Sequence, residues 1–329
     1  MEFVNIKDSE INVSRIALGT WAIGGWMWGG TDEKKSIETI LGAFEKGINM
    51  LDTAPIYGFG VSEQIVGKAV KEYGKREDVI IATKTGLEWE NSEVTRNSSR
   101  GHILKEVEDS LRRLQTDYID IYQIHWPDKS VPFEETAETM KGLLKEGKIR
   151  AIGVSNFSLA QMDTFRQVVE ISTAQPPYNL FEREVEKDVL PYCIKEGINI
   201  LAYGSLCRGL LSGKMTSDRE FHGDDLRKYD PKFQKGHFMQ YLKVVEKLDL
   251  FAEENFGKKV IHLAVRWILD KTKSGVALWG ARKPEQLDVL EGVLGWSLNK
   301  SDMDAIDSII ENYMDQSIGP EFMAPPEEV

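Results

Sequence analysis

Short apolar segments alternate with helical segments along most of this chain, and this alternation restricts the fold more than any other feature. Eight apolar segments, each three to six residues long, are predicted to be buried strands. They are Ile16–Leu18, Ile48–Leu51, Val79–Thr83, Ile119–Ile124, Ile149–Val154, Ile171–Ala174, Ile200–Tyr203 and Val276–Trp279. Strands that alternate with helices form parallel sheets, and eight such units are typical of a closed barrel. The sequence therefore predicts an α/β fold, a single (β/α)8 TIM barrel.

The segments between these strands carry helical signals. Thr31–Lys46, for example, has Asp32 and Glu33 in its first turn and Gly47 directly after its end. In Arg100–Leu114 the apolar side chains recur on one face of a helix. The other expected helices are Val61–Tyr73, Phe133–Glu146, Ser158–Val168, Leu190–Glu196, Lys259–Asp270, Lys283–Leu290 and Ser301–Glu311.

Three segments lie outside the regular alternation. Residues 3–14 resemble a small N-terminal β-hairpin, Gly204–Gly257 is an insertion after the seventh strand with one helix near Gln240–Asn255, and Ser317–Val329 is an irregular tail. Because no linker-like composition separates the units, we expect one domain over residues 1–329. The alternative is an open doubly wound sheet, but no Gly-x-Gly-x-x-Gly turn follows the first strand.

Composition excludes several classes of function. The net charge is −12, and no basic block is present, so we expect no nucleic-acid partner. No apolar run approaches the length of a membrane span, and the N-terminus has no signal-peptide pattern. The two cysteines, Cys193 and Cys207, lack the spacing of a metal site. We therefore expect a cytoplasmic protein without a bound metal.

Polar side chains occur where three consecutive strands end. The second strand ends in Asp52, the third in Lys84 and the fourth in His125, while Tyr57 lies in the Pro- and Gly-bounded turn after the second strand. In a parallel barrel, the carboxyl ends of all strands lie on one face. The sequence therefore predicts that a carboxylate, an ammonium, an imidazole and a phenol share one site, although a capping Asp and a packing Tyr are also compatible with the second strand alone.

These four groups suit the addition of a hydride and a proton to a carbonyl group. Tyr57 would donate the proton, and we expect the Lys84 cation to lower the pKa of the phenol. Asp52 would serve as the counter-ion that keeps the buried lysine charged. His125 would donate a hydrogen bond to the substrate oxygen.

The same residues resemble the catalytic tetrad of the aldo-keto reductases. The resemblance extends almost from end to end and is carried by several separated motifs. These are Leu18–Trp21, Leu51–Ala54 with Tyr57–Gly58, Gly147–Arg150 with Gly153–Phe157, and Gln175 with Tyr178–Asn179. Within that family, Gly25–Gly30 and Gly319–Met323 are similar to bacterial NADPH-dependent reductases of the general stress protein 69 type.

The resemblance implies NADP(H) as cofactor and a set of residues that bind it. Ser155, Asn156 and Gln175 would hold the nicotinamide amide, and Tyr203 would stack on the ring. Gly204–Arg208 would wrap the pyrophosphate with backbone amides, and Arg282 would bind the 2′-phosphate through its forked donors. The full set is Thr20, Trp21, Asp52, Ser155, Asn156, Gln175, Tyr203, Gly204, Ser205, Leu206, Arg208, Lys214, Arg227, Gly280, Ala281, Arg282 and Gln286.

Several assignments depart from the family pattern or have a second interpretation. Leu290 and Trp279 replace residues that many relatives carry near the adenine. Lys214 and Arg227 suit either a phosphate clamp or solvated charge. An aromatic substrate pocket is expected from Trp21, Trp26, Trp28 and Trp126, with Met27 nearby; packing is the alternative for the residues of the first loop.

Two other functions are compatible with the same fold. A strand-end lysine such as Lys84 also suits a barrel aldolase that forms a Schiff base. The β-subunits of potassium channels share this fold and tetrad, so a regulatory binding role is the second alternative. The preferred hypothesis is a monomeric reductase of small carbonyl compounds, which does not bind a membrane or nucleic acid.

Overall fold

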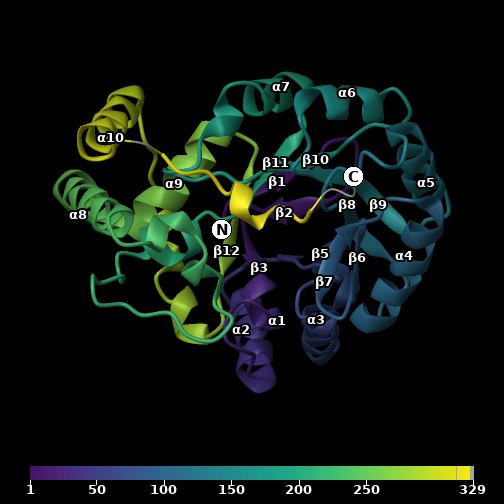
Figure 1. Ribbon diagram of the computed structural model, residues 1–329. Coiled ribbons are helices and arrows are strands. Elements are labelled where there is room, and N and C mark those ends of the chain that lie inside the picture. Colours follow the sequence, from purple (N-terminus) through teal and green to yellow (C-terminus); the bar gives the residue numbers. More distant parts are fainter. Residues whose placement is uncertain (316, 327–329) are drawn as a thin grey trace.

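The structure is a computed structural model that describes residues 1–315 and 317–326. Within these residues, eight strands close into a barrel in the order β10-β11-β12-β3-β4-β5-β8-β9 (Figure 1). Within the barrel, every pair of neighbouring strands with an assigned register is parallel. The strands are β3 (Ile16–Gly19), β4 (Met50–Asp52), β5 (Ile80–Thr85), β8 (Ile119–Ile124), β9 (Ile149–Ser155), β10 (Thr173–Gln175), β11 (Asn199–Ala202) and β12 (Val276–Gly280). The predicted TIM barrel is confirmed.

Helices surround the barrel on its outer side (Figure 1). They are α2 (Glu33–Glu45), α3 (Val61–Tyr73), α4 (Arg100–Leu114), α5 (Phe133–Lys145), α6 (Leu159–Arg166), α7 (Val189–Glu196) and α9 (Val260–Thr272). In α4 the periodic residues Ile103, Val107 and Leu114 are fully buried against the strands, which is why this pattern predicted the helix correctly. The insertion contributes α8 (His237–Phe256), which packs against α10 (Lys300–Tyr313).

The N-terminal hairpin closes one end of the barrel. Strands β1 (Phe3–Asn5) and β2 (Asn12–Ser14) pair antiparallel, as predicted. Ile6 and Ile11 at the turn are buried in one cluster with barrel residues such as Met50 and Leu201. The hairpin fills this end of the barrel with apolar side chains. A polar site is therefore expected at the other end, where the carboxyl ends of the strands lie.

Two parts of the structure differ from the sequence-based expectation. A second hairpin, β6 (Leu87–Glu90) and β7 (Glu93–Arg96), follows β5 in a segment to which the sequence analysis assigned no element. Its two-residue turn, Asn91 and Ser92, has positive φ at both positions, as a type I′ turn requires. The predicted helix Lys283–Leu290 is wrong, because this segment starts with a Pro284–Leu287 3-10 turn that ends after one turn.

Two glycines bring the loops after β3 and β4 into backbone contact. The loop after β3 begins with the short helix α1 (Trp21–Gly24), which was not predicted. A Cβ atom on Gly58 would lie 2.1 Å from the carbonyl oxygen of Gly24, and one on Gly24 would lie 2.6 Å from the Tyr57 backbone. Gly58 also has a φ of 66°, which favours glycine. The position of the Tyr57 loop therefore depends on the absence of both side chains.

No helix within the described residues is both long and apolar enough to cross a lipid bilayer.

Candidate active site

Four side chains from three neighbouring strands meet at the carboxyl end of the barrel. Asp52 is the last residue of β4, Lys84 is the penultimate residue of β5, and His125 follows β8 directly. These strands are adjacent in the barrel, and Tyr57 returns over them from the turn after β4. The structure thus brings together the four residues that the sequence analysis placed in one site.

Lys84 is the centre of this group. Its side chain is fully buried, and its ammonium donates to Asp52 Oδ2 at 2.8 Å, to the Thr53 carbonyl at 2.9 Å and to Tyr57 OH at 3.2 Å. An ammonium has three protons, so these three acceptors use all of them. Burial lowers the pKa of Lys84, and the charge of Asp52 opposes that effect.

The pKa of Tyr57 differs from the expectation. Burial raises the pKa of this phenol well above its ordinary value, and the negative charge of Asp52 raises it further. The prediction that Lys84 gives a net lowering of this pKa is therefore wrong. The main reason is burial, and Lys84 offsets only the charge of Asp52, with which it forms a close ion pair. Tyr57 stays protonated in the resting site.

His125 stays neutral for a related reason. Burial and the nearby charge of Lys84 lower the pKa of His125 well below its ordinary value. Its ring lies edge-on to that of Tyr57, with 5.8 Å between the ring centroids. A neutral imidazole keeps one N–H, which is available to an oxygen placed beside the Tyr57 hydroxyl.

Two glutamines hold the other oxygen of Asp52. Gln175 Nε2 donates to Asp52 Oδ1 at 2.7 Å, and Gln123 Nε2 lies 3.3 Å from the same atom. Gln123 pairs with Lys84 in the β5–β8 register and was not among the predicted site residues. An amide in the otherwise apolar end of Ile119–Ile124 was the signal that could have revealed it.

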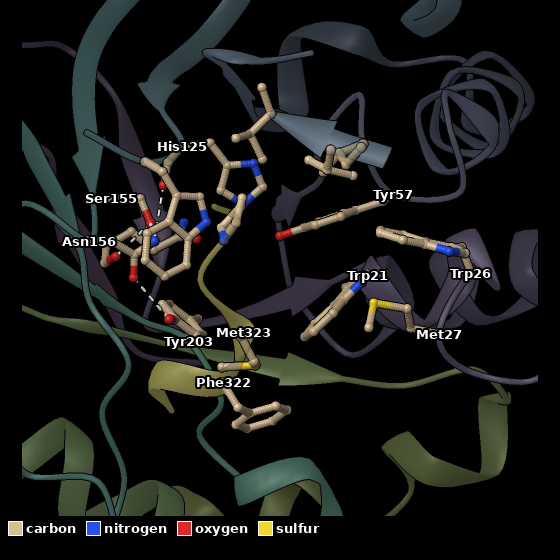
Figure 2. A pocket seen from close by; sticks show the side chains of 16 residues that line it. Trp21, Trp26, Met27, Tyr57, His125, Ser155, Asn156, Tyr203, Phe322 and Met323 are labelled. Carbon is tan, nitrogen blue, oxygen red and sulfur yellow. Dashed lines mark hydrogen bonds between the residues drawn. The ribbon is translucent and has the colours of Figure 1, made fainter. Parts of the chain in front are cut away.

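A cavity of about 190 Å³ lies directly above these groups. Figure 2 shows the Tyr57 hydroxyl directed towards its centre, with Ser155, Asn156 and Tyr203 on one side and Trp21, Trp26 and Met27 on the other. Among the described residues, those that line the cavity include no Lys, Arg, Asp or Glu side chain. They are Trp21, Trp26, Met27, Ile56, Tyr57, Leu87, Val94, His125, Trp126, Ser155, Asn156, Gln175, Tyr203, Phe322, Met323 and Pro325. The cavity therefore suits an uncharged, largely apolar molecule.

The lining corrects and extends the predicted pocket. Trp21, Trp26 and Trp126 line the cavity, but Trp28 does not. The ring of Trp28 instead packs edge-on against Trp21 at 5.5 Å and lies 5.3 Å from the Arg227 guanidinium. The β6–β7 hairpin and the C-terminal tail add apolar side chains that sequence reasoning missed, because no local pattern shows which distant segment covers a barrel mouth.

The residues predicted to hold a nicotinamide form one connected group. Ser155 Oγ donates to the Gln175 carbonyl, Asn156 Nδ2 donates to the His125 carbonyl at 3.0 Å, and Tyr203 OH donates to Asn156 Oδ1 at 2.9 Å. Among the described residues, none donates to Gln175 Oε1, which therefore remains an acceptor for a carboxamide N–H₂ group. A flat ring against Tyr203 with its carboxamide towards Gln175 fits these donors and acceptors.

Arg282 lies near Arg227 at the end of β12. Its guanidinium donates to the carbonyl oxygens of Trp28, at 2.7 Å, and of Gly30, so it joins this region to the loop after β3. Burial and the charge of Arg227 lower the pKa of Arg282. Gln286 accepts from the backbone N–H of Arg282 and shapes the turn, while Gly280 is exposed and Ala281 is buried. The carboxylates of Asp225 and Asp224 oppose the effect of Arg227 on Arg282.

The remaining predicted cofactor residues have other contacts. Thr20 is buried and donates to the Asp52 carbonyl, and Ser205 donates to the Ala202 carbonyl. Arg208 is buried in ion pairs with Glu182 and Asp230, so its backbone alone is available to a ligand. Gly204 and Leu206 are partly exposed, Lys214 is exposed, and Arg227 binds Asp225.

The two positions that depart from the family pattern lie in the core. Leu290 is fully buried, and Trp279 is almost fully buried, both in the main hydrophobic cluster. They contribute packing at this end of the barrel.

A parallel barrel with a buried lysine–carboxylate pair, a phenol and an imidazole at its carboxyl end defines the class of this protein as a barrel enzyme. Comparison with known proteins gives the family. Residues 15–311 match the aldo/keto reductase family. The chain is 63% identical over 326 residues to aldo-keto reductase YhdN of Bacillus subtilis, and the match covers 99% of this chain and 98% of that protein.

Two further relatives support the same conclusion. The structure of glycerol dehydrogenase AKR11B4 from Gluconobacter oxydans is similar with a TM-score of 0.89 and 51% identity, covering 98% of this chain and 99% of that one. The NADH-specific methylglyoxal reductase of Escherichia coli is 37% identical, covering 93% of this chain and 96% of that protein. The chain belongs to the aldo/keto reductase family. It is an NAD(P)-dependent oxidoreductase.

Proposed function

We propose that this chain reduces aldehydes and ketones to alcohols with NADPH and that Tyr57 is the general acid. The observation that carries the proposal is the position of the Tyr57 hydroxyl, 3.2 Å from the Lys84 ammonium and at the wall of an apolar cavity. A protonated phenol supported by a buried cation can give its proton to a carbonyl oxygen as negative charge develops there.

The proposed roles follow from this geometry. When bound, the reduced nicotinamide supplies a hydride to the carbonyl carbon. Tyr57 transfers its proton to the carbonyl oxygen, and the phenolate that remains lies beside Lys84. Asp52 favours the charged form of Lys84 against the effect of burial. His125 donates its ring N–H to the same oxygen and orients the carbonyl.

The choice of NADPH rests on Arg282. The relatives leave this choice open, because the Escherichia coli protein is named as NADH-specific. Arg282 places a forked guanidinium near the end of β12 that can donate to a 2′-phosphate, and Arg227, which is paired with Asp225, lies nearby. To bind that phosphate, Arg282 exchanges its contacts with the Trp28 and Gly30 carbonyls for the ligand. Ser155, Asn156, Gln175 and Tyr203 would hold the nicotinamide.

The alternative functions are less well supported. A Schiff-base aldolase needs a neutral amine that reaches the substrate, whereas Lys84 is fully buried and donates to three acceptors. Borohydride trapping with an aldehyde tests this alternative directly, and we expect no adduct on Lys84. A purely regulatory role predicts binding of the nucleotide without turnover.

We further propose that the whole chain acts as one cytoplasmic, monomeric domain of the general stress protein 69 type. Two observations support this placement. Cys193 and Cys207 are buried free thiols, which suits a reducing compartment. Gly25–Gly30 and Gly319–Met323, the segments that carry this resemblance, contribute Trp26, Met27, Phe322 and Met323 to the cavity.

A panel of aldehydes tested with NADPH and with NADH examines the proposal. We expect oxidation of NADPH that depends on the aldehyde and loss of most of this activity in Tyr57→Phe. If no aldehyde or ketone in the panel is reduced although the protein binds NADPH, the proposed reaction is wrong. Full activity of Tyr57→Phe would instead remove Tyr57 from its role.

A further inference from the structure

The C-terminal tail forms one wall of the cavity. Phe322, Met323 and Pro325 line it, and Figure 2 shows Phe322 and Met323 at its lower edge, between Tyr203 and Trp21. The described part of the tail, residues 317–326, contains only one short 3-10 turn, Glu321–Met323, so regular secondary structure does little to fix the position of this part. Other contacts must hold it over the barrel mouth.

Two buried cations from distant parts of the chain bind the tail on either side of Phe322 and Met323. Lys232, in the insertion, donates to the Gly319 carbonyl at 2.9 Å. Arg96, the last residue of β7, donates to the Pro325 carbonyl at 2.9 Å. Lys232 is fully buried and Arg96 is 8% exposed. Charged donors to carbonyl oxygens in such surroundings make strong hydrogen bonds.

Lys232 belongs to a buried group of four charges. It lies 2.8 Å from Glu182 and 3.5 Å from Asp230, and both carboxylates also bind Arg208. Two positive and two negative groups balance, so the group is neutral as a whole. The Phe322 ring lies 5.7 Å from the Arg208 guanidinium and 6.0 Å from the Lys232 ammonium. This group therefore fixes both the backbone and the ring of the tail.

Arg96 connects three parts of the cavity wall. Besides the Pro325 carbonyl, it donates to the Pro127 carbonyl at 2.8 Å, and its guanidinium lies 5.4 Å from the ring centre of Trp126, which lines the cavity. Through this one side chain, the β6–β7 hairpin, the loop after β8 and the tail keep fixed positions relative to one another.

We propose that Arg96, together with Lys232, is a positioning residue that sets the affinity of the cavity for bulky carbonyl substrates. Neither side chain lines the cavity, so each acts through the wall residues that it holds: Lys232 through the tail, and Arg96 through the tail and Trp126. This inference rests on the proposed reductase function. It predicts that loss of Arg96 weakens the binding of a substrate long enough to touch the tail and spares a substrate too small to reach it.

The test compares Arg96→Met with a matched control, Arg100→Met, which removes an exposed arginine four residues further on. Steady-state reduction of naphthaldehyde and of acetaldehyde is measured with NADPH. For Arg96→Met we expect KM for naphthaldehyde to rise about tenfold, the scale of lost apolar contacts in a pocket. We expect kcat and KM for acetaldehyde, and the affinity for NADPH, to stay within about twofold of wild type. Equal changes for both aldehydes, or none, would overturn the proposal.

A double-mutant cycle with Met323→Ala identifies the part of the wall through which Arg96 acts. If Arg96 holds the tail, its removal should raise KM for naphthaldehyde less in the Met323→Ala background than in wild type. Full additivity would show that Arg96 does not act through Met323 and would overturn the role of this part of the tail.

Chymotryptic cleavage at Phe322 follows the tail without any need for turnover. We expect faster cleavage in Arg96→Met and in Lys232→Met than in wild type, with Lys235→Met, an exposed lysine nearby, as the control. Far-UV circular dichroism shows whether the Lys232 variant is folded, since its buried group loses one positive charge. Unchanged cleavage in a folded Arg96→Met protein would contradict the proposal. Absence of reductase activity in wild type would count only against the proposed function.

Discussion

Gln175 donates a hydrogen bond of 2.7 Å to Asp52 from the opposite side of the barrel. Strands β10 and β4 are four positions apart in the closed order of eight, so this bond crosses the full width of the barrel mouth. Asp52 in turn binds the Lys84 ammonium with its other oxygen. A residue proposed to hold the nicotinamide is therefore in direct contact with the counter-ion of the proposed acid group.

We predict that Gln175→Met impairs both the binding of the nucleotide and the chemical step. It removes the Oε1 acceptor and the shorter of the two amide bonds to Asp52. A hydrogen bond to a charged group contributes roughly 1.5 to 3 kcal/mol, so we expect kcat to fall by about ten- to a hundredfold, with weaker NADPH binding. Fluorescence titration with NADPH and steady-state kinetics measure the two effects.

Gln123→Met is the matched control for this variant. Gln123 also lies near Asp52 Oδ1 but does not line the cavity, so its loss should reduce kcat and leave NADPH affinity within about twofold. Equal losses of affinity in both variants would show that Gln175 acts only through Asp52.

Tyr57→Phe should remove most of the rate while leaving the fold and the cofactor site in place. General acids contribute roughly 10² to 10⁴ in rate, and the variant keeps the ring that packs against Trp21. We expect a loss of kcat on that scale and NADPH binding within a few-fold of wild type. A rate near that of wild type in single-turnover experiments would assign the proton to another group.

The pH profile of reduction follows from the three perturbed groups of the site, Tyr57, His125 and Lys84. Tyr57 donates a proton, and its pKa is raised well above 10.0, so the active protonated form persists through neutral and mildly alkaline pH. His125 acts as a neutral imidazole, and its pKa is lowered well below 6.5, so protonation inactivates it only in more acidic solution. We therefore expect neither Tyr57 nor His125 to ionise between pH 6.5 and pH 10.0 in a stopped-flow or steady-state profile of kcat. Burial lowers the pKa of Lys84, so an alkaline limb within that window would report the loss of the Lys84 proton.

The Lys84→Met variant tests the electrostatic effect of Lys84 on the pKa of Tyr57. The substitution leaves the charge of Asp52 without its partner, which raises the pKa of Tyr57 further, so the rate should fall and any alkaline limb should move upward. A shift of the alkaline limb to lower pH would contradict the proposed effect of the Lys84 and Asp52 charges on the pKa of Tyr57.

Arg282→Ala tests the choice of cofactor. A charge-assisted contact with the 2′-phosphate contributes roughly 1.5 to 3 kcal/mol, so we expect NADPH affinity to fall by about one to two orders of magnitude. NADH lacks that phosphate and serves as the internal control, with little change expected. The difference should shrink as salt increases, because Arg282 is partly exposed. Equal losses for both cofactors would mean that Arg282 only holds the Trp28 loop.

The parts of this molecule that were predictable from sequence are those with local signals. The helix Arg100–Leu114 and the strand Ile119–Ile124 were predicted with the correct bounds, because apolar periodicity and apolar runs depend on neighbouring residues. Asp52, Lys84 and His125 were predicted to share a site because the carboxyl ends of parallel barrel strands lie on one face. Neighbouring strands of the barrel follow one another along the chain, so this prediction needed no information about distant contacts.

The remaining features depend on contacts between distant segments. Arg96 and Pro325 are 229 positions apart, and Lys232 and Gly319 are 87 positions apart. No short pattern marks either pair, so the tail wall was not predicted. The pKa of Tyr57 was predicted with the wrong sign because burial and the charge balance of the Lys84–Asp52 pair are properties of the folded site.

The contact between Gly24 and Gly58 has a consequence for engineering this cavity. A library that randomises the aromatic loop after β3 and the Tyr57 turn together would place side chains at two positions where the backbones leave no volume for a Cβ atom. Most members of such a library should fail because the phenol is displaced, whatever the quality of the new pocket. A library that keeps both glycines and varies Trp26, Met27, Leu87 and Val94 can change the shape of the cavity while the proton donor stays in place.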